Sequence, residues 1–253
     1  MSRKIAWVVL LVACLIISVC GMAGAKVEGT KHDFSLNNGA TNFGGTNLEL
    51  ENAYPVEEIC VFCHTPHSAA PTAATGVQGL LWNRSGSSAA TYKMYTSSTL
   101  TDAVRTNMGA APTGLTLMCM SCHDGITSIA VGTLINAPYS QGDRQQVTLT
   151  GPYSAIGELY RNVLPIPGWR ANIGNMVVGD TEANLSDDHP VSFEWVPGIT
   201  GIKDPAAWGA APLKLFSNRM ECSTCHDVHD NTHEPFLRMS NVNSDMCTTC
   251  HIK

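Results

Sequence analysis

The stretch CVFCHTPH, residues 60–67, holds two cysteines and two histidines. Its first five residues match the C-x-x-C-H signature by which c-type haem is attached to a protein. Two thiols add across the two vinyl groups of haem, and the two intervening residues let both sulfurs meet one porphyrin edge. The next residue then falls beneath the ring, where its imidazole can bind iron. The stretch therefore predicts a haem, but it leaves the second histidine, His67, to be explained.

The same signature occurs at three further places, CMSCH (119–123), CSTCH (222–226) and CTTCH (247–251). Zinc ribbons also repeat C-x-x-C, and exported proteins often form disulfides, but neither requires a histidine after every second cysteine. We therefore predict four covalently bound haem c groups. Their thioether bonds would come from Cys60, Cys63, Cys119, Cys122, Cys222, Cys225, Cys247 and Cys250, and their proximal iron ligands would be His64, His123, His226 and His251.

The N-terminus has the pattern of a secretory signal peptide. Arg3 and Lys4 precede an apolar run, and Ala23-Gly24-Ala25 is typical of a cleavage site. We predict a signal peptide at 1–25 and one tetrahaem cytochrome domain at 26–253. Cys20 leaves lipid modification open as an alternative. No later segment of the sequence is long and apolar enough to span a bilayer.

The composition leaves little apolar material for a protein-only core. Charged residues make up 14% of the chain, against roughly 25% in an average soluble domain. Aromatic residues make up 7%, and the net charge of −6 disfavours nucleic acid as a partner. We expect a mostly irregular fold with short helices at the haem-attachment sites and few strands, including some between the second and third motifs. In this fold the haems act as the core.

Five histidines remain once the proximal ligands are assigned: His32, His67, His189, His229 and His233. A closed haem needs a second ligand on its opposite face, so four haems need four distal ligands. We assign this role to His32, His67, His189 and His229, and we expect His233 to lie at the surface. Asp187 or Asp188 could hold the other ring nitrogen of His189. Methionine ligation, which would raise the reduction potential, is a minority alternative.

The spacing of His67 limits which iron it can bind. Residues three apart on a helical turn point the same way, whereas the two axial ligands of one iron lie on opposite sides of the ring. His67 therefore cannot complete the haem held by His64. The same argument applies to His229, three residues after His226. Each CHxxH motif thus predicts a second haem within reach of the first.

Several stretches together resemble a known family. They are KHDFS (31–35), CVFCHTPH, LLWNR (80–84), CMSCHDG (119–125), DDHPVSF (187–193), LFSNRMECSTCHDVH (215–229), FLR (236–238) and CTTCHIK (247–253). This set is similar to the extracellular tetrahaem cytochromes of metal-reducing bacteria, of the OmcE type. The resemblance implies bis-histidine ligation at every haem, closely stacked haem pairs, and head-to-tail filaments in which a neighbouring copy supplies one distal histidine. Carried onto this chain, that histidine is His67.

The leading functional hypothesis is a non-catalytic electron conduit, located outside the cell or on its outer surface. Its partners would be copies of itself, redox partner cytochromes that present Lys or Arg, and external acceptors such as metal oxides or electrodes. A soluble periplasmic shuttle is an alternative, because relatives with the same CHxxH and DHPV elements include such carriers. A multihaem reductase is a further alternative, although it would need one haem with an open position.

Overall fold

The structure is a computed structural model that describes residues 27–30, 32–33, 42–43, 46–47, 58–70, 80–84, 86–87, 89–124, 135, 173 and 182–252. The predicted signal peptide lies outside the described residues. The same holds for most of the segment 125–181, where strands were expected. Within the described ranges, no helix is long and apolar enough to cross a membrane.

A helix or helical turn accompanies each of the four C-x-x-C-H motifs. These elements are η2 (Ile59–Phe62), α4 (Gly114–His123), α6 (Cys222–Cys225) and α7 (Asp245–Cys250). In three motifs the histidine N–H donates to the carbonyl of the first cysteine: His64 to Cys60 at 2.8 Å, His226 to Cys222 at 3.0 Å and His251 to Cys247 at 2.8 Å. This turn places both cysteines on one side of the chain.

The chain leaves the helical conformation at the last two of these histidines. His226 (φ −110°, ψ 147°) and His251 (φ −89°, ψ 136°) are both extended. The imidazole therefore stands at the end of the cysteine turn, where the backbone changes direction.

Among the described residues, three further helical elements carry none of the motifs. They are α3 (Asp102–Met108), η4 (Pro205–Ala207) and η5 (Val242–Ser244). Thr101 caps α3 by accepting a hydrogen bond from the N–H of Val104 at 3.3 Å. Gly109 ends the same helix at φ 71°, a conformation that glycine adopts without strain.

The described strands form three two-stranded pairs. Strand β1 (Asn42–Phe43) pairs antiparallel with β2 (Thr46–Asn47), and β3 (Thr91–Lys93) pairs parallel with β4 (Glu182–Asn184). Strand β5 (Phe193–Glu194) pairs antiparallel with β6 (Arg219–Met220), with Phe193 opposite Met220. The last pair brings the segment that follows His189 against the residues that precede the third motif.

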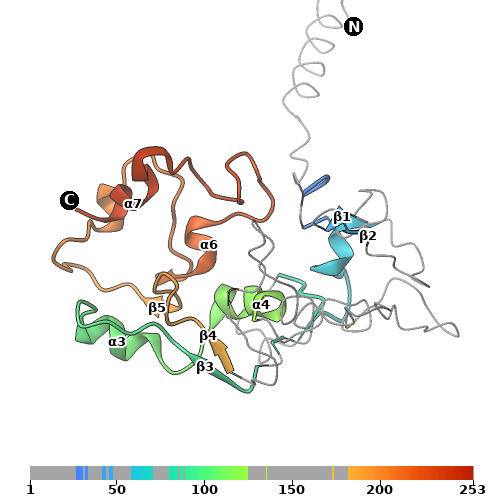
Figure 1. Ribbon diagram of the computed structural model, residues 1–253, viewed down its shortest axis with the longest axis horizontal. Helices are drawn as coiled ribbons and strands as arrows, with labels where there is room; N and C mark the ends of the chain where they lie inside the picture. Colours follow the sequence, from blue (N-terminus) through green and yellow to red (C-terminus); the bar gives the residue numbers. More distant parts are fainter. Residues whose placement is uncertain are drawn as a thin grey trace, which may run out of the picture.

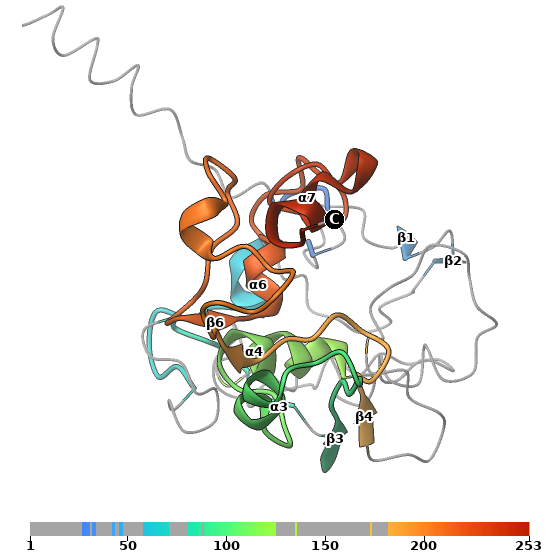
Figure 2. The same cartoon turned by 90° about the vertical axis from the view of Figure 1, so that its left-hand side faces the viewer.

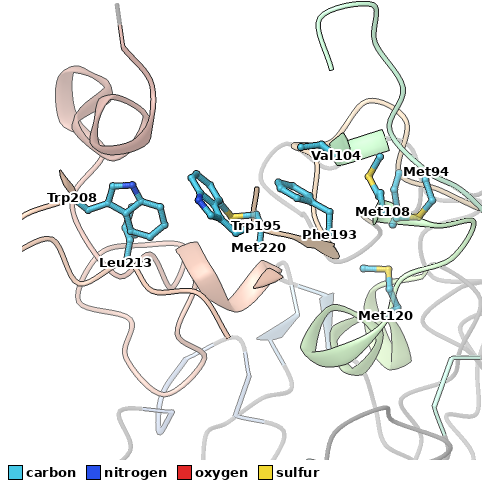
Figure 3. Close-up of a cluster of buried hydrophobic side chains, with 10 residues drawn as sticks. Met94, Val104, Met108, Met120, Phe193, Trp195, Trp208, Leu213 and Met220 are labelled. Atoms are coloured by element: carbon cyan, nitrogen blue, oxygen red, sulfur yellow. The ribbon is translucent and has the colours of Figure 1, made fainter. Parts of the chain in front are cut away.

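Ten of the buried hydrophobic side chains in the described residues form a cluster beside the second and third motifs. It contains Met94, Val104, Met108, Met120, Leu185, Phe193, Trp195, Trp208, Leu213 and Met220. Figure 3 shows them in a row that runs from Trp208 past β5 to α3 and α4. Trp195 and Trp208 meet edge to face, with ring centroids 5.6 Å apart. Packing of this cluster therefore holds α4 and the region around β5 and β6 together.

We predict that Trp195→Ala destabilises the haem-loaded protein by about 3–5 kcal/mol, because truncating a buried indole leaves a cavity and removes the contact with Trp208. The free energy of unfolding, measured by denaturant titration, checks this value. Val242→Ala is the matched control, since Val242 is 66% exposed. It should change stability by less than about 0.5 kcal/mol.

Candidate haem-binding sites

No disulfide joins any of the eight cysteines of the four motifs. Burial raises the pKa of Cys63 to about 12 and that of Cys225 to about 11. These thiols are therefore neutral at physiological pH and lie in an environment poor in water. Such surroundings suit the apolar edge of a porphyrin.

Cysteines of successive motifs lie near one another. Besides burial, Cys122 raises the pKa of Cys63, which links the first motif to the second. The thiols of Cys119 and Cys222 share a hydrogen bond that raises the pKa of Cys119 and lowers that of Cys222. The pKa of Cys225, raised first by burial, is raised further by Cys250.

The attachment points therefore follow one another in space in their sequence order. Figures 1 and 2 both show α6, the third motif, between α4 and α7. Redox groups attached to these cysteines would form a row with neighbours close together.

Six of the predicted ligands are brought together as three pairs, each made of one proximal and one distal histidine. The ring centroids are 6.0 Å apart for His64 and His229, 5.9 Å for His32 and His123, and 6.2 Å for His189 and His251. The pairs join the first motif to the CHxxH of the third, the second motif to the N-terminal segment, and the fourth motif to the segment DDHPV.

These separations fit two imidazoles on one metal ion. A histidine nitrogen binds a metal at about 2.0–2.1 Å and lies about 1 Å from its own ring centre, so two trans ligands have centroids about 6 Å apart. If two imidazoles bound one metal, each ring plane would contain the axis through the metal, and rotation about that axis would be free. The interplanar angles of 19° for His64 and His229 and 82° for His32 and His123 are thus both compatible with shared ligation.

Backbone carbonyls lie at hydrogen-bond distance from the Nδ1 atoms of three predicted iron ligands, two from the pairs and His226. The Nδ1 of His64 contacts the carbonyl of Leu80 at 2.7 Å, that of His189 contacts Pro190 at 2.9 Å, and that of His226 contacts Pro235 at 3.0 Å. A carbonyl only accepts, so Nδ1 carries the proton and Nε2 keeps its lone pair for a metal. At the Nδ1 of His189 the structure thus places the carbonyl of Pro190, where the sequence suggested Asp187 or Asp188.

Burial also lowers the pKa of three of the predicted ligands, which favours the neutral imidazole. It lowers the pKa of His32 to about 4, with a smaller contribution from His123. Burial likewise lowers the pKa of His189 and of His226. A neutral imidazole is the form that binds a metal.

Three histidines lie outside the three pairs. His226 is half-buried at the end of α6. His67 is exposed, and its carbonyl accepts a hydrogen bond from the Thr65 hydroxyl at 2.9 Å. His233 is half-buried, and its carbonyl accepts from the N–H of Leu237 at 2.7 Å.

Sequence reasoning missed residues that support the ligands. Asn83 is fully buried and binds the first motif twice, through its N–H to the Cys63 carbonyl at 2.9 Å and through its side-chain amide to the Val61 carbonyl at 2.7 Å. Trp82 packs edge to face against His64 at 6.1 Å. The stretch LLWNR was noted only for its resemblance, and no local pattern places it against the motif.

The C-terminal part of the chain, residues 215–253, matches the family model described as a doubled CXXCH motif. No curated protein matches the chain. The matched residues contain the third and fourth motifs, whose histidines end α6 and α7. C-x-x-C-H motifs imply covalently bound haem c. The doubled motif, together with two further copies in the same chain, indicates a multihaem c-type cytochrome, a class of protein that generally carries electrons.

Proposed function

We propose that this protein is a tetrahaem electron conduit in which histidines ligate every iron from both sides. The observation that carries the proposal is the set of three histidine pairs, each with a centroid separation of 5.9–6.2 Å. Every pair combines the histidine of one C-x-x-C-H motif with a histidine from elsewhere in the chain. An iron capped on both faces exchanges electrons but offers no position for a substrate.

The pairs assign ligands to three of the four haems. The first haem would be held by His64 and His229, the second by His123 and His32, and the fourth by His251 and His189. The third haem would use His226, whose Nδ1 is already engaged by Pro235.

Haem supplies the one-electron chemistry, whereas the chain attaches, orients and shields it. The adjacent thiols of Cys119 and Cys222 would keep the second and third groups close, as electron exchange requires. We further propose that the haems replace much of the missing apolar core of this mostly irregular chain.

The proposal extends to a head-to-tail filament outside the cell. His67 is exposed, and the iron that His64 would bind already has His229 as its candidate second ligand. His67 of a neighbouring copy would ligate the iron held by His226, and the haem row would continue from copy to copy. The resemblance to filament-forming cytochromes supports this arrangement, as does the exposure of His67. External electron acceptors would then be reached along the polymer.

Mass spectrometry, optical spectroscopy and electron microscopy of the secreted protein test this function. We expect a mass increase of four haems, a low-spin spectrum, no carbon monoxide binding to the reduced native protein, and filaments. A native iron that binds carbon monoxide would contradict the closed conduit. Four closed haems in a protein that stays monomeric would retain the conduit and contradict the filament.

A further inference from the structure

The helices that carry the second and third motifs meet at their N-terminal ends. Helix α4 begins at Gly114 and α6 begins at Cys222, and the two lie against each other in Figures 1 and 2. The first N–H groups of any helix lack partners within that helix and need other acceptors. Here each helix provides an acceptor for the other.

Two residues, Thr116 and Glu221, exchange these hydrogen bonds. The Glu221 carboxylate accepts from the N–H of Thr116 at 3.0 Å and also from the Thr116 hydroxyl. The Thr116 hydroxyl in turn accepts from the N–H of Cys222 at 3.2 Å. The N–H of Glu221 donates to the Thr224 hydroxyl at 3.0 Å, which completes the start of α6. Together, Glu221 and Thr116 therefore tie α4, which carries the second motif, to Cys222 of the third motif.

The contact between Thr116 and Glu221 is close and buried. Thr116 is fully buried and Glu221 is 2% exposed. Gly114 has φ +59°, and a Cβ added there would lie 2.7 Å from Oε1 of Glu221. Only glycine permits this backbone conformation and this approach without strain.

A partly exposed arginine extends the contact to a third segment. Arg219 Nε donates to Oε1 of Glu221 at 3.2 Å, and the same guanidinium donates to the carbonyl of Ser192 at 2.6 Å and to the hydroxyl of Thr113 at 2.9 Å. Ser192 follows the iron-ligand candidate His189 closely. The Arg219 side chain is 26% exposed, whereas that of Glu221 is 1% exposed. Water therefore screens the positive charge more than the negative one, and the local field is negative.

We propose that Glu221 is a positioning residue for electron transfer, which fixes the second haem relative to the third and lowers the reduction potentials of both. The inference rests on the proposed function, because it requires haems at these motifs. A buried negative charge favours the oxidised, more positive haem. The reciprocal hydrogen bonds hold the first cysteines of the two motifs, Cys119 and Cys222, in contact.

Glu221→Gln tests the proposal, because glutamine keeps the shape of the side chain and removes its charge. Asp102→Asn is the matched control, since it removes a carboxylate charge whose side chain is 95% exposed on α3. In a potentiometric titration of the haem-loaded protein, the equilibrium constant for reduction should rise roughly tenfold at two of the four haems. This corresponds to an increase of about 59 mV in the reduction potential of each, for one electron. The control should leave all four potentials in place.

Hydrogen–deuterium exchange provides a readout that does not depend on redox activity. The amide of Thr116 should exchange about tenfold faster in Glu221→Gln, because the variant weakens its acceptor. If Glu221→Gln fails to fold, Glu221→Asp replaces it: the charge stays but its reach is shorter, so the Thr116 amide should exchange faster while the potentials stay near those of the natural protein.

The haem count separates the two proposals. A natural protein with fewer than four haems would count against the proposed function. The role of Glu221 would be overturned if the natural protein holds four haems and Glu221→Gln leaves their reduction potentials unchanged. Unchanged exchange of the Thr116 amide, in whichever variant folds, would also overturn it.

Discussion

Replacing His229 by alanine is expected to open one of the four proposed haems. The ring of His229 lies 6.0 Å from that of His64, the separation of two imidazoles on one iron. Without His229, the iron bound by His64 should become high-spin and accept about one equivalent of carbon monoxide in the reduced native protein. The thioether bonds from Cys60 and Cys63 should persist, so mass spectrometry should still count four haems. Optical spectra with and without carbon monoxide measure the change.

His233→Ala is the control for this variant. His233 belongs to the same C-terminal region, and its backbone carbonyl, which accepts from the N–H of Leu237, is retained when the residue is alanine. All four haems should stay low-spin in this control. A fully low-spin His229→Ala protein would show that a different side chain completes the iron bound by His64.

Replacing His67 by alanine is expected to abolish filaments while all four haems stay attached. In the proposed polymer the exposed His67 links each copy to the iron bound by His226 of the next, so its loss removes a covalent coordination bond at every junction. Electron microscopy should show no filaments, and size-exclusion chromatography should show monomers. The monomer should bind about one equivalent of carbon monoxide when reduced.

Adding free imidazole separates the loss of an iron ligand from the loss of the junction between copies. Added imidazole should cap the open iron of the His67→Ala monomer and restore a low-spin spectrum, yet it cannot join two chains, so filaments should not return. Glu58→Gln, at an exposed residue near the first motif, should polymerise normally. Normal filaments from His67→Ala would show that another residue makes the junction.

The local conformation at the motifs followed from short-range rules. In the first motif the turn is closed by a hydrogen bond from His64 to Cys60, and such a bond spans only the motif itself. Short helices at the attachment sites could therefore be predicted from the motifs alone. The longer helix at the second motif, Gly114–His123, depends in addition on Glu221 accepting from Thr116, a contact between residues far apart in the chain.

The set of candidate ligands could be predicted, but the way they pair could not. Counting histidines showed that enough distal ligands exist. The helical argument that excluded His67 as the partner of His64 does not describe this segment, because η2 ends at Phe62 and residues 64–67 are not helical. Neither argument selects His229 for His64, or His189 for His251. The hydrogen-bond partner of the His189 ring was also not predicted, because the Pro190 carbonyl lies where Asp187 or Asp188 was expected.

By itself the sequence determined which residues can attach and ligate haem, since the C-x-x-C-H signature depends on five consecutive residues and needs no distant partner. Only the tertiary structure decided which histidines face each other and which motifs are neighbours. Those relations depend on contacts between distant segments, such as the pairing of Phe193 with Met220 and the bond between Thr116 and Glu221. Long-range packing selects among pairings that are equally compatible with the local sequence.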